Sequence, residues 1–289
     1  MFTMDAEGSN TMTLSSSGGE IMTSSAAAGE TVDWQEAGCV TAVKDQGECG
    51  ACWAFSATAA MESGYCVATG SLPSLSDQQL ISCNTEDGNS GCGGGYAAYS
   101  MDWVANERSG KMCTLDTYPF TSENGNVASC SMSSCTEFDV GVTGYESVHK
   151  DPGAIEDAVR NQPVSIFLYS GSTAFQYYSG GVLTGENCDK TGSHSDWQWV
   201  LVRRMITFFT GALRTSGHVV GEEGYVRVQR RYSGDSEGAC GVELYATWPT
   251  FDVSASPTPA PRPTTSAPSA TTATPSVTTA TPSATRSQQ

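Results

Sequence analysis

A cysteine with the surroundings of a nucleophile stands at position 52, within Val43-Lys-Asp-Gln-Gly-Glu-Cys-Gly-Ala-Cys-Trp-Ala-Phe-Ser56. It directly precedes a run with few helix breakers, Trp53 to Met61, and Gly47 and Gly50 allow a tight loop just upstream. A thiol on the first turn of a helix lies near unpaired backbone N–H groups and the positive end of the helix dipole, which favour the thiolate. Because the thiolate is the nucleophilic form, Cys52 could attack a carbonyl carbon.

A donor for the oxyanion that this attack creates lies six residues earlier in the chain. The side-chain amide of Gln46 and the backbone N–H of Cys52 could together receive the negative charge. Cys49 and Cys52 could instead form a disulfide, half of a zinc site or a redox pair. A zinc site needs a second pair at a suitable spacing, which Cys83 and Cys92 do not form. A redox pair is expected beside a β-α-β pattern, which is absent, so the sequence favours a nucleophile.

The stretch Gln46-Gly-Glu-Cys-Gly-Ala-Cys-Trp-Ala-Phe55 resembles the active-site segment of the papain-like cysteine proteases, whose local signature is C-G-[SA]-C-[WY]. Three further stretches resemble the same family: Val32-Asp33-Trp34, Ser90-Gly-Cys-Gly-Gly-Gly95 and Gly221-Glu-Glu-Gly-Tyr225. The resemblance covers residues 32–252 and implies a cysteine-type endopeptidase that acts on proteins or peptides. It needs no metal and no organic cofactor.

The resemblance implies an α+β fold of two lobes, a helical N-terminal lobe and an antiparallel, β-barrel-like C-terminal lobe, with a cleft between them. The residues themselves indicate a change from helices to strands along the chain. Helices are expected at Cys52–Cys66, from the capping box Ser76-x-x-Gln79 onward, at Tyr96–Glu107 and from Asp151-Pro152 to Pro163. Strands separated by glycine turns are expected at Val164–Tyr169, Phe175–Leu183, Tyr225–Gln229 and Val242–Trp248.

A thiolate protease needs a histidine to hold the ion pair and to protonate the leaving amine. The chain has three histidines, His149, His194 and His218. The family places this residue about 130–150 residues after the cysteine, and His194 lies 142 residues after Cys52. It also follows a stretch, 175–188, that resembles the strand and turn before the family's histidine. The resemblance therefore implies that His194 is catalytic.

The glycine-rich run before Tyr96 has a role in the family as well. The resemblance implies that the backbones of Gly94 and Gly95 hold the substrate strand, and that residues near Tyr96, Ala97 and Val164 line the specificity pocket. Without the resemblance, three consecutive glycines would indicate only a flexible loop.

Eleven cysteines indicate an oxidising compartment, and the odd number fits one nucleophile and five pairs. The resemblance implies the disulfides Cys49–Cys92, Cys83 with Cys130 or Cys135, and Cys188–Cys240. Cys39, Cys66, Cys113 and the remaining member of the Cys130/Cys135 pair stay unassigned, because spacing alone does not fix connectivity. We expect an extracellular or a lysosome- or vacuole-like location.

One expected catalytic residue is missing. The family places an asparagine beyond the histidine, in an Asn-Ser-Trp-Gly context, where it orients the imidazole, but this chain has no asparagine after Asn187. Residues 195–220 depart from the family pattern, which resumes at Gly221. Reading the codons two bases later through 196–215 and one base later through 217–221 permits a family-like sequence with the asparagine restored. We interpret 195–220 as frameshifted and expect this chain to be inactive or poorly folded. Inactivity is expected because losing the orienting residue costs about 10³–10⁴ in rate.

The two ends differ in composition from the rest. Residues 1–31 are rich in Ser, Thr, Gly and Ala and are expected to be a prosegment remnant or disordered arm, and 253–289 a Ser/Thr/Pro-rich disordered tail. The N-terminus lacks the basic and apolar regions of a signal peptide, so we expect a chain truncated upstream. No apolar run is long enough to span a bilayer.

The balance of charge excludes some partners. With 14 basic and 31 acidic residues the net charge is −17, which repels nucleic acid and anionic membranes. We expect a monomer. Two other functions stay open: a papain-like pseudoenzyme that acts as a decoy or binding scaffold, which the missing asparagine favours, and a disulfide-rich wall or matrix protein, which only the tail favours.

Overall fold

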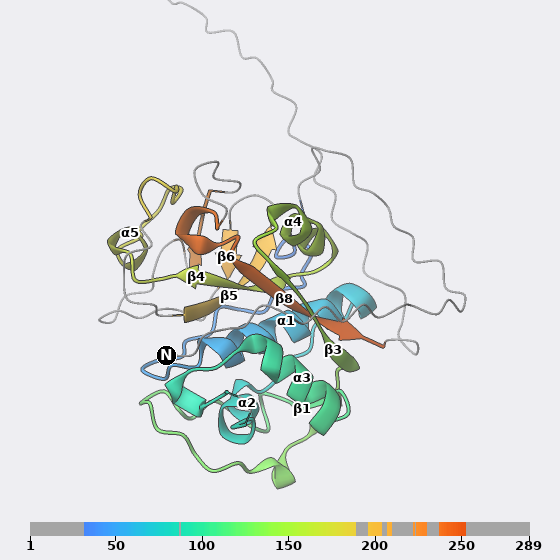
Figure 1. The fold of residues 1–289 in the computed structure, drawn as a ribbon. Helices are drawn as coiled ribbons and strands as arrows, with labels where there is room; N and C mark the ends of the chain where they lie inside the picture. Colours follow the sequence, from blue (N-terminus) through green and yellow to red (C-terminus); the bar gives the residue numbers. More distant parts are fainter. Residues whose placement is uncertain are drawn as a thin grey trace, which may run out of the picture. The chain divides into compact units, whose positions relative to one another are not determined.

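The structure is a computed structural model that describes residues 32–86, 88–188, 196–203, 207–209, 222, 224–229 and 237–252, without the side chains of 196–203 and 207–209 (Figure 1). The chain separates into two units, Met1–Glu30 and Thr31–Gln289, and all described residues belong to the second. The arm and tail expected at 1–31 and 253–289 lie outside the described residues, as does His194. In the described part, no helix is both long and apolar enough to cross a membrane.

The first half of the second unit is helical, and its helices begin where local signals place them. Helix α1 (Cys52–Thr69) starts at Cys52 itself. Helix α2 (Asp77–Cys83) is capped by Ser76, whose Oγ accepts a hydrogen bond from Gln79 N at 3.0 Å, as the capping box predicts. Helix α3 (Ala97–Glu107) follows a short 3₁₀ turn, Gly91–Gly93. Strands β1 (Lys111–Cys113) and β2 (Glu137–Asp139) form a small antiparallel ribbon behind these helices.

The second half is organised around a six-stranded antiparallel sheet in the order β3-β8-β4-β5-β6-β7. The strands are β3 (Val142–His149), β4 (Val164–Tyr169), β5 (Asp196–Arg203), β6 (Thr207–Phe209), β7 (Tyr225–Val226) and β8 (Tyr245–Phe251). Helix α4 (Pro152–Asn161), capped by Asp151, joins β3 to β4, and the short helix α5 (Thr173–Gln176) follows β4. Among the described strands β3 and β7 are the two edges, so this sheet is open and forms no closed barrel.

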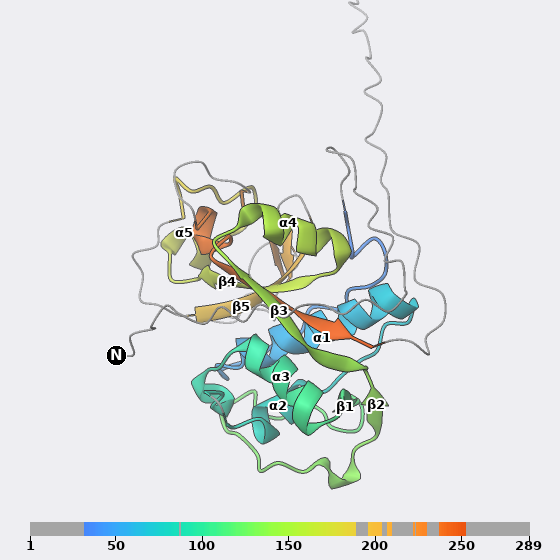
Figure 2. The ribbon, with the colours of Figure 1, turned by 45° about the vertical axis from the view of Figure 1, so that its right-hand side comes forward.

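Two separate hydrophobic cores define the two lobes. One is built on the helices and includes Trp53, Met61 and Leu80, and the other lies between the sheet and α4 and includes Ile166 and Phe175. Helix α1 contacts α2 and α3 on one side and β4, β5 and β8 on the other. Figures 1 and 2 show it between the helical group and the sheet. The predicted α+β fold of two lobes is therefore confirmed, and Cys52 begins the helix that both lobes share.

Three strand predictions were wrong in part. The strand predicted at Tyr225–Gln229 covers only Tyr225–Val226, followed by an isolated bridge at Val228. Residues 175–183 form the end of α5 and a glycine turn in place of a strand, because Ser172 Oγ accepts from Phe175 N at 3.1 Å and so starts a helix. The last strand begins at Tyr245, after the 3₁₀ turn Ala239–Gly241, and runs on to Phe251. Apolar residues alone did not reveal these caps and turns.

The segment interpreted as frameshifted contributes backbone to the centre of the sheet. Asp196–Leu201 pairs with β4 from Tyr169 to Val164, and 207–209 pairs with 203–200 on the other side of β5. Every residue except proline offers a backbone N–H and C=O for such pairing, so the pairing alone does not test the frameshift interpretation. The frameshift and its effect on folding stay predictions.

Candidate active site

Cys52 occupies the first position of the 18-residue helix α1. The N-cap residue Ala51 offers no side-chain hydrogen bond, so the first N–H groups of the helix are not capped by it. Cys52 is half-buried and lies outside the five disulfides that the structure contains. This is the setting in which a helix favours a thiolate.

Gln46 is folded into the turn that leads to Cys52. Its side chain is buried, with 3% exposed, and its Nε2 donates to the carbonyl oxygen of Cys49 at 2.8 Å. Ala51 N donates to the same oxygen at 2.8 Å. The amide of Gln46 and the start of α1 therefore share one acceptor. We call residues 45–49 the Gln46 turn.

The predicted substrate-binding residues lie beside the start of α1. A Cβ on Gly95 would clash with Asn89 Oδ1 and Trp53, so this position accepts only glycine. Gly94 has φ +108° and, among the described residues, no atom within 4 Å of where a Cβ would stand. Tyr96 is 43% exposed, and its N–H donates to Asn89 Oδ1 at 2.7 Å. An extended chain could approach Gly94 here without meeting a side chain.

Five disulfides fix these segments. Cys49–Cys92 ties the Gln46 turn to the glycine-rich loop, and Gly50 N donates to Cys92 O at 3.1 Å beside it. The others are Cys83–Cys130, Cys188–Cys240, Cys39–Cys66 and Cys113–Cys135. The structure thus gives Cys83 the first of its two possible partners and pairs the four cysteines whose connectivity spacing could not fix.

Of the three histidines, the structure describes only His149. His149 is exposed at the end of β3, paired with Tyr245, while His194 and His218 lie outside the described residues. The backbone that follows His194 begins β5 at Asp196, and β5 is in contact with α1. In the sequence, His194 therefore stands two residues before a strand that contacts α1, the helix that begins at Cys52.

A buried charge cluster, which the sequence reasoning missed, supports the Gln46 turn. Lys44 Nζ lies 3.2 Å from Glu62 Oε1 on α1 and 3.0 Å from Asp77 Oδ2 on α2. Both carboxylates are at most 1% exposed, and Glu62 also accepts from Leu75 N at 2.7 Å. Glu62, the one charged residue of helix α1, was the signal that could have revealed it.

Burial and mutual attraction shift the pKa values of the three side chains in this cluster. Burial raises the pKa of Glu62 and that of Asp77 above their ordinary values, although Lys44 opposes this. Burial alone would lower the pKa of Lys44, but the attraction of Asp77 and Glu62 outweighs it and raises that pKa. The carboxyl groups therefore titrate above their ordinary range, while Lys44 stays protonated there.

We expect the protein to become more resistant to urea as the pH is lowered toward the unfolded carboxyl pKa values of about 4, and Glu62→Gln to weaken this dependence. The folded state binds protons at Glu62 and Asp77 more tightly than the unfolded chain. The resulting stabilisation is complete below the unfolded pKa values of about 4, and is lost as the pH rises through the folded ones. Each unit of raised pKa contributes about 1.4 kcal/mol. Urea midpoints across this range check the prediction.

The net charge of −17 acts in the same direction, because protonation relieves repulsion, so a control is needed. Glu146→Gln removes the same charge from an exposed position on β3. If Glu62→Gln leaves as steep a pH dependence as Glu146→Gln, the buried cluster does not titrate as described.

The family is established by comparison with known proteins. The model of the papain family cysteine proteases matches residues 28–250, and the chain belongs to that family. It is 40% identical over 223 residues to the cysteine endopeptidase RepA of Oryza sativa subsp. japonica, covering 75% of this chain and 56% of that one. It is 38% identical over 234 residues to vignain of Vigna mungo, covering 79% and 61%. The chain thus spans about three-fifths of the length of these curated relatives.

Solved structures agree with this assignment. The Carica candamarcensis cysteine protease CMS1MS2 in complex with E-64 superposes with a TM-score of 0.66 at 32% identity, covering 77% of this chain and 98% of that chain. The bromelain protease of Ananas comosus in complex with the E64 inhibitor gives 0.64 at 28% identity, covering 77% and 99%.

Proposed function

We propose that this protein is a cysteine-type endopeptidase in which Cys52 is the nucleophile, His194 the proton shuttle and Gln46 a donor to the oxyanion. The observation that carries the proposal is the position of Cys52. It is the first residue of α1, stands outside the five disulfides and adjoins the turn that holds Gln46. Membership of the papain family and the relatives named as endopeptidases support the same reaction.

The proposed reaction proceeds through an acyl-enzyme. Cys52 Sγ bonds to the carbonyl carbon of the substrate, and the carbonyl π electrons move to oxygen. The Cys52 N–H and one N–H of Gln46 Nε2 stabilise this oxyanion; an amide nitrogen has two hydrogens, and the bond to Cys49 O uses one. His194 protonates the departing amine as the C–N bond breaks. The carbonyl re-forms and leaves a thioester. Water then attacks the thioester carbon and gives a proton to His194, and the C–S bond breaks to release the acid and restore the Cys52 thiolate.

The substrate is proposed to be an extended polypeptide. The open side of Gly94 leaves its backbone accessible to a substrate strand, and the exposed ring of Tyr96 could contact a side chain of that strand. The cleft between the lobes and the remaining pocket residues stay predictions. The five disulfides and the relationship to plant proteases, one of them the KDEL-tailed cysteine endopeptidase CEP2 of Arabidopsis thaliana, support a location in the secretory route, outside the cell or in a vacuole.

The absence of an asparagine after Asn187 favours a second candidate, a papain-like pseudoenzyme that binds peptides without cleaving them. Without that side chain the imidazole of His194 lacks its predicted orienting partner. The retained Cys52, Gln46 and His194 favour the enzyme, with a rate reduced by about 10³–10⁴.

Hydrolysis of a peptide amide by the full chain, with and without prior treatment by a thiol alkylator, tests the proposal. We expect slow hydrolysis that the alkylator abolishes, since alkylation blocks Cys52. A folded chain that shows no alkylator-sensitive hydrolysis would be the pseudoenzyme.

A further inference from the structure

Two consecutive residues of α2, Asp77 and Gln78, are linked to the Gln46 turn through two different parts of the chain. Asp77 binds Lys44, which directly precedes the turn. Gln78 reaches a different part of the chain, residues 121–125, which we call the buttress segment. Its Oε1 accepts from Thr121 N at 2.8 Å, and its Nε2 donates to Ser122 Oγ at 2.9 Å. Gln78 and Ser122 are both fully buried.

The buttress segment in turn supports the Gln46 turn through Glu123. The carbonyl oxygen of Glu123 accepts from Glu48 N at 2.7 Å. A Cβ on Gly47, whose φ is +59°, would clash with that same oxygen, so the two backbones are in close contact. A chain of contacts, buried at Gln78 and Ser122 and closer to the surface at Glu123, thus runs to the turn that carries Gln46.

From this geometry we propose that Gln78 is a positioning residue for the oxyanion site: by fixing the Glu123 carbonyl against Gly47 and Glu48, it sets the direction of the Gln46 side chain. This inference rests on the proposed role of Gln46. Gln46 and Gln78 do not need to touch, because the Glu123 carbonyl transmits the constraint through the turn backbone. A donor that stabilises an oxyanion must be held in place before the reaction, since a misplaced donor loses most of its effect.

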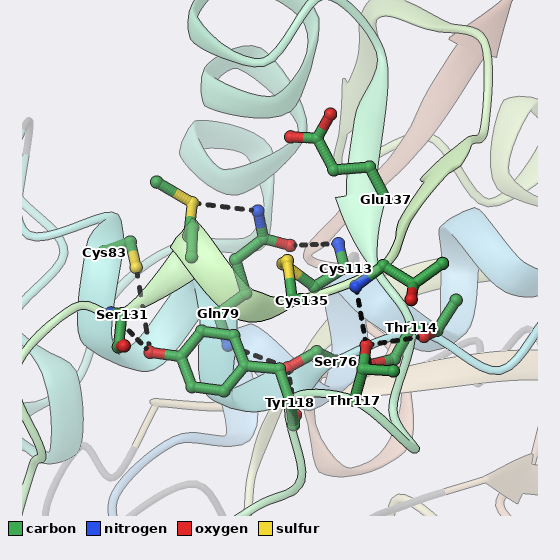
Figure 3. Close-up of a disulfide and its surroundings, with 12 residues drawn as sticks. Ser76, Gln79, Cys83, Cys113, Thr114, Thr117, Tyr118, Ser131, Cys135 and Glu137 are labelled. Carbon is green, nitrogen blue, oxygen red and sulfur yellow. Dashed lines mark hydrogen bonds between the residues drawn. A yellow bond between two sulfur atoms is a disulfide. The ribbon is translucent and has the colours of Figure 1, made fainter.

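The neighbouring Gln79 provides a matched control. It lies on the same helix and is equally buried, but its Oε1 accepts from Cys113 N at 2.7 Å and its Nε2 donates to Met132 Sδ at 3.3 Å. Figure 3 shows Gln79 beside the Cys113–Cys135 disulfide. Gln79 therefore holds β1 and the 3₁₀ turn Met132–Ser134, and neither of these two side-chain hydrogen bonds goes to the buttress segment.

The test compares Gln78→Ala with Gln79→Ala in the full chain by two measurements. Amide hydrogen exchange over 45–50 is expected to speed up in Gln78→Ala only, because the Glu48 N–H loses its fixed acceptor. A peptide aldehyde, whose carbonyl oxygen becomes an oxyanion when Cys52 adds to it, is expected to bind about 10- to 100-fold more weakly to Gln78→Ala. The rate of Cys52 alkylation by iodoacetamide, which forms no oxyanion, is expected to change less than about twofold in both variants.

The proposal is overturned if exchange over 45–50 is equal in the two variants, or if aldehyde affinity and alkylation rate fall together in Gln78→Ala. If Gln78→Ala does not fold, Ser122→Ala breaks the same link with a smaller change and is read in the same way. If the unaltered chain reacts with neither the peptide aldehyde nor iodoacetamide, the proposed function is wrong. Hydrogen exchange over 45–50 would still show whether Gln78 holds the turn.

Discussion

Restoring the orienting asparagine is expected to raise kcat/KM for peptide-amide hydrolysis by about 10³- to 10⁴-fold. The variant replaces 196–220 by the residues obtained when the codons are read two bases later through 215 and one base later through 221. An imidazole held in one orientation can both pair with the thiolate and protonate the leaving amine, whereas an unoriented one does so rarely. Steady-state kinetics on a fluorogenic peptide amide measure the change.

The matched control carries the same re-read segment with the restored asparagine changed to alanine. It keeps the new apolar pattern of the strands and removes only the orienting side chain. If both re-read chains gain equally, the benefit comes from better folding of the sheet and not from the histidine. If neither gains, the frameshift interpretation is wrong.

Replacing Cys52 by alanine is expected to lower kcat/KM by about 10⁶-fold in the chain with the asparagine restored. In the chain as it stands the expected loss is only about 10²- to 10³-fold. Residues that act as one catalytic unit are strongly non-additive, so a unit already impaired by the missing asparagine has less left to lose.

Cys52→Ser is the control for this substitution, because it keeps the size of the side chain and the start of α1. It should leave the urea midpoint unchanged and be about as inactive as Cys52→Ala. Activity within about tenfold of the parent in either variant would show that another group attacks the substrate.

Local signals in the sequence predicted the elements that position the candidate site. The capping box at Ser76 and the helix start at Cys52 depend on a few adjacent residues, and both lie where they were predicted. The strand Val164–Tyr169 was predicted to the residue, because a short apolar run between Pro163 and a glycine turn leaves little choice.

The contacts that hold the Gln46 turn could not be predicted in this way. Lys44 contacts Asp77, and the carbonyl oxygen of Glu123 accepts from Glu48 N, in both cases across a long stretch of the chain. Neither the spacing nor the local pattern of these residues indicates the contacts. The strand predicted at 175–183 failed for a related reason: the cap at Ser172 outweighed the strand preference of the aromatic residues after it.

Reaction with E-64, the inhibitor bound in the solved relatives, tests the central claim most directly. The full chain is treated with E-64, digested without reduction and mapped by mass spectrometry. We predict a single adduct, on Cys52, formed much faster in the folded chain than after unfolding in urea, because only the folded chain places that thiol at the start of α1. An adduct elsewhere, or none on a chain shown to be folded, would contradict the assignment of Cys52 as the nucleophile.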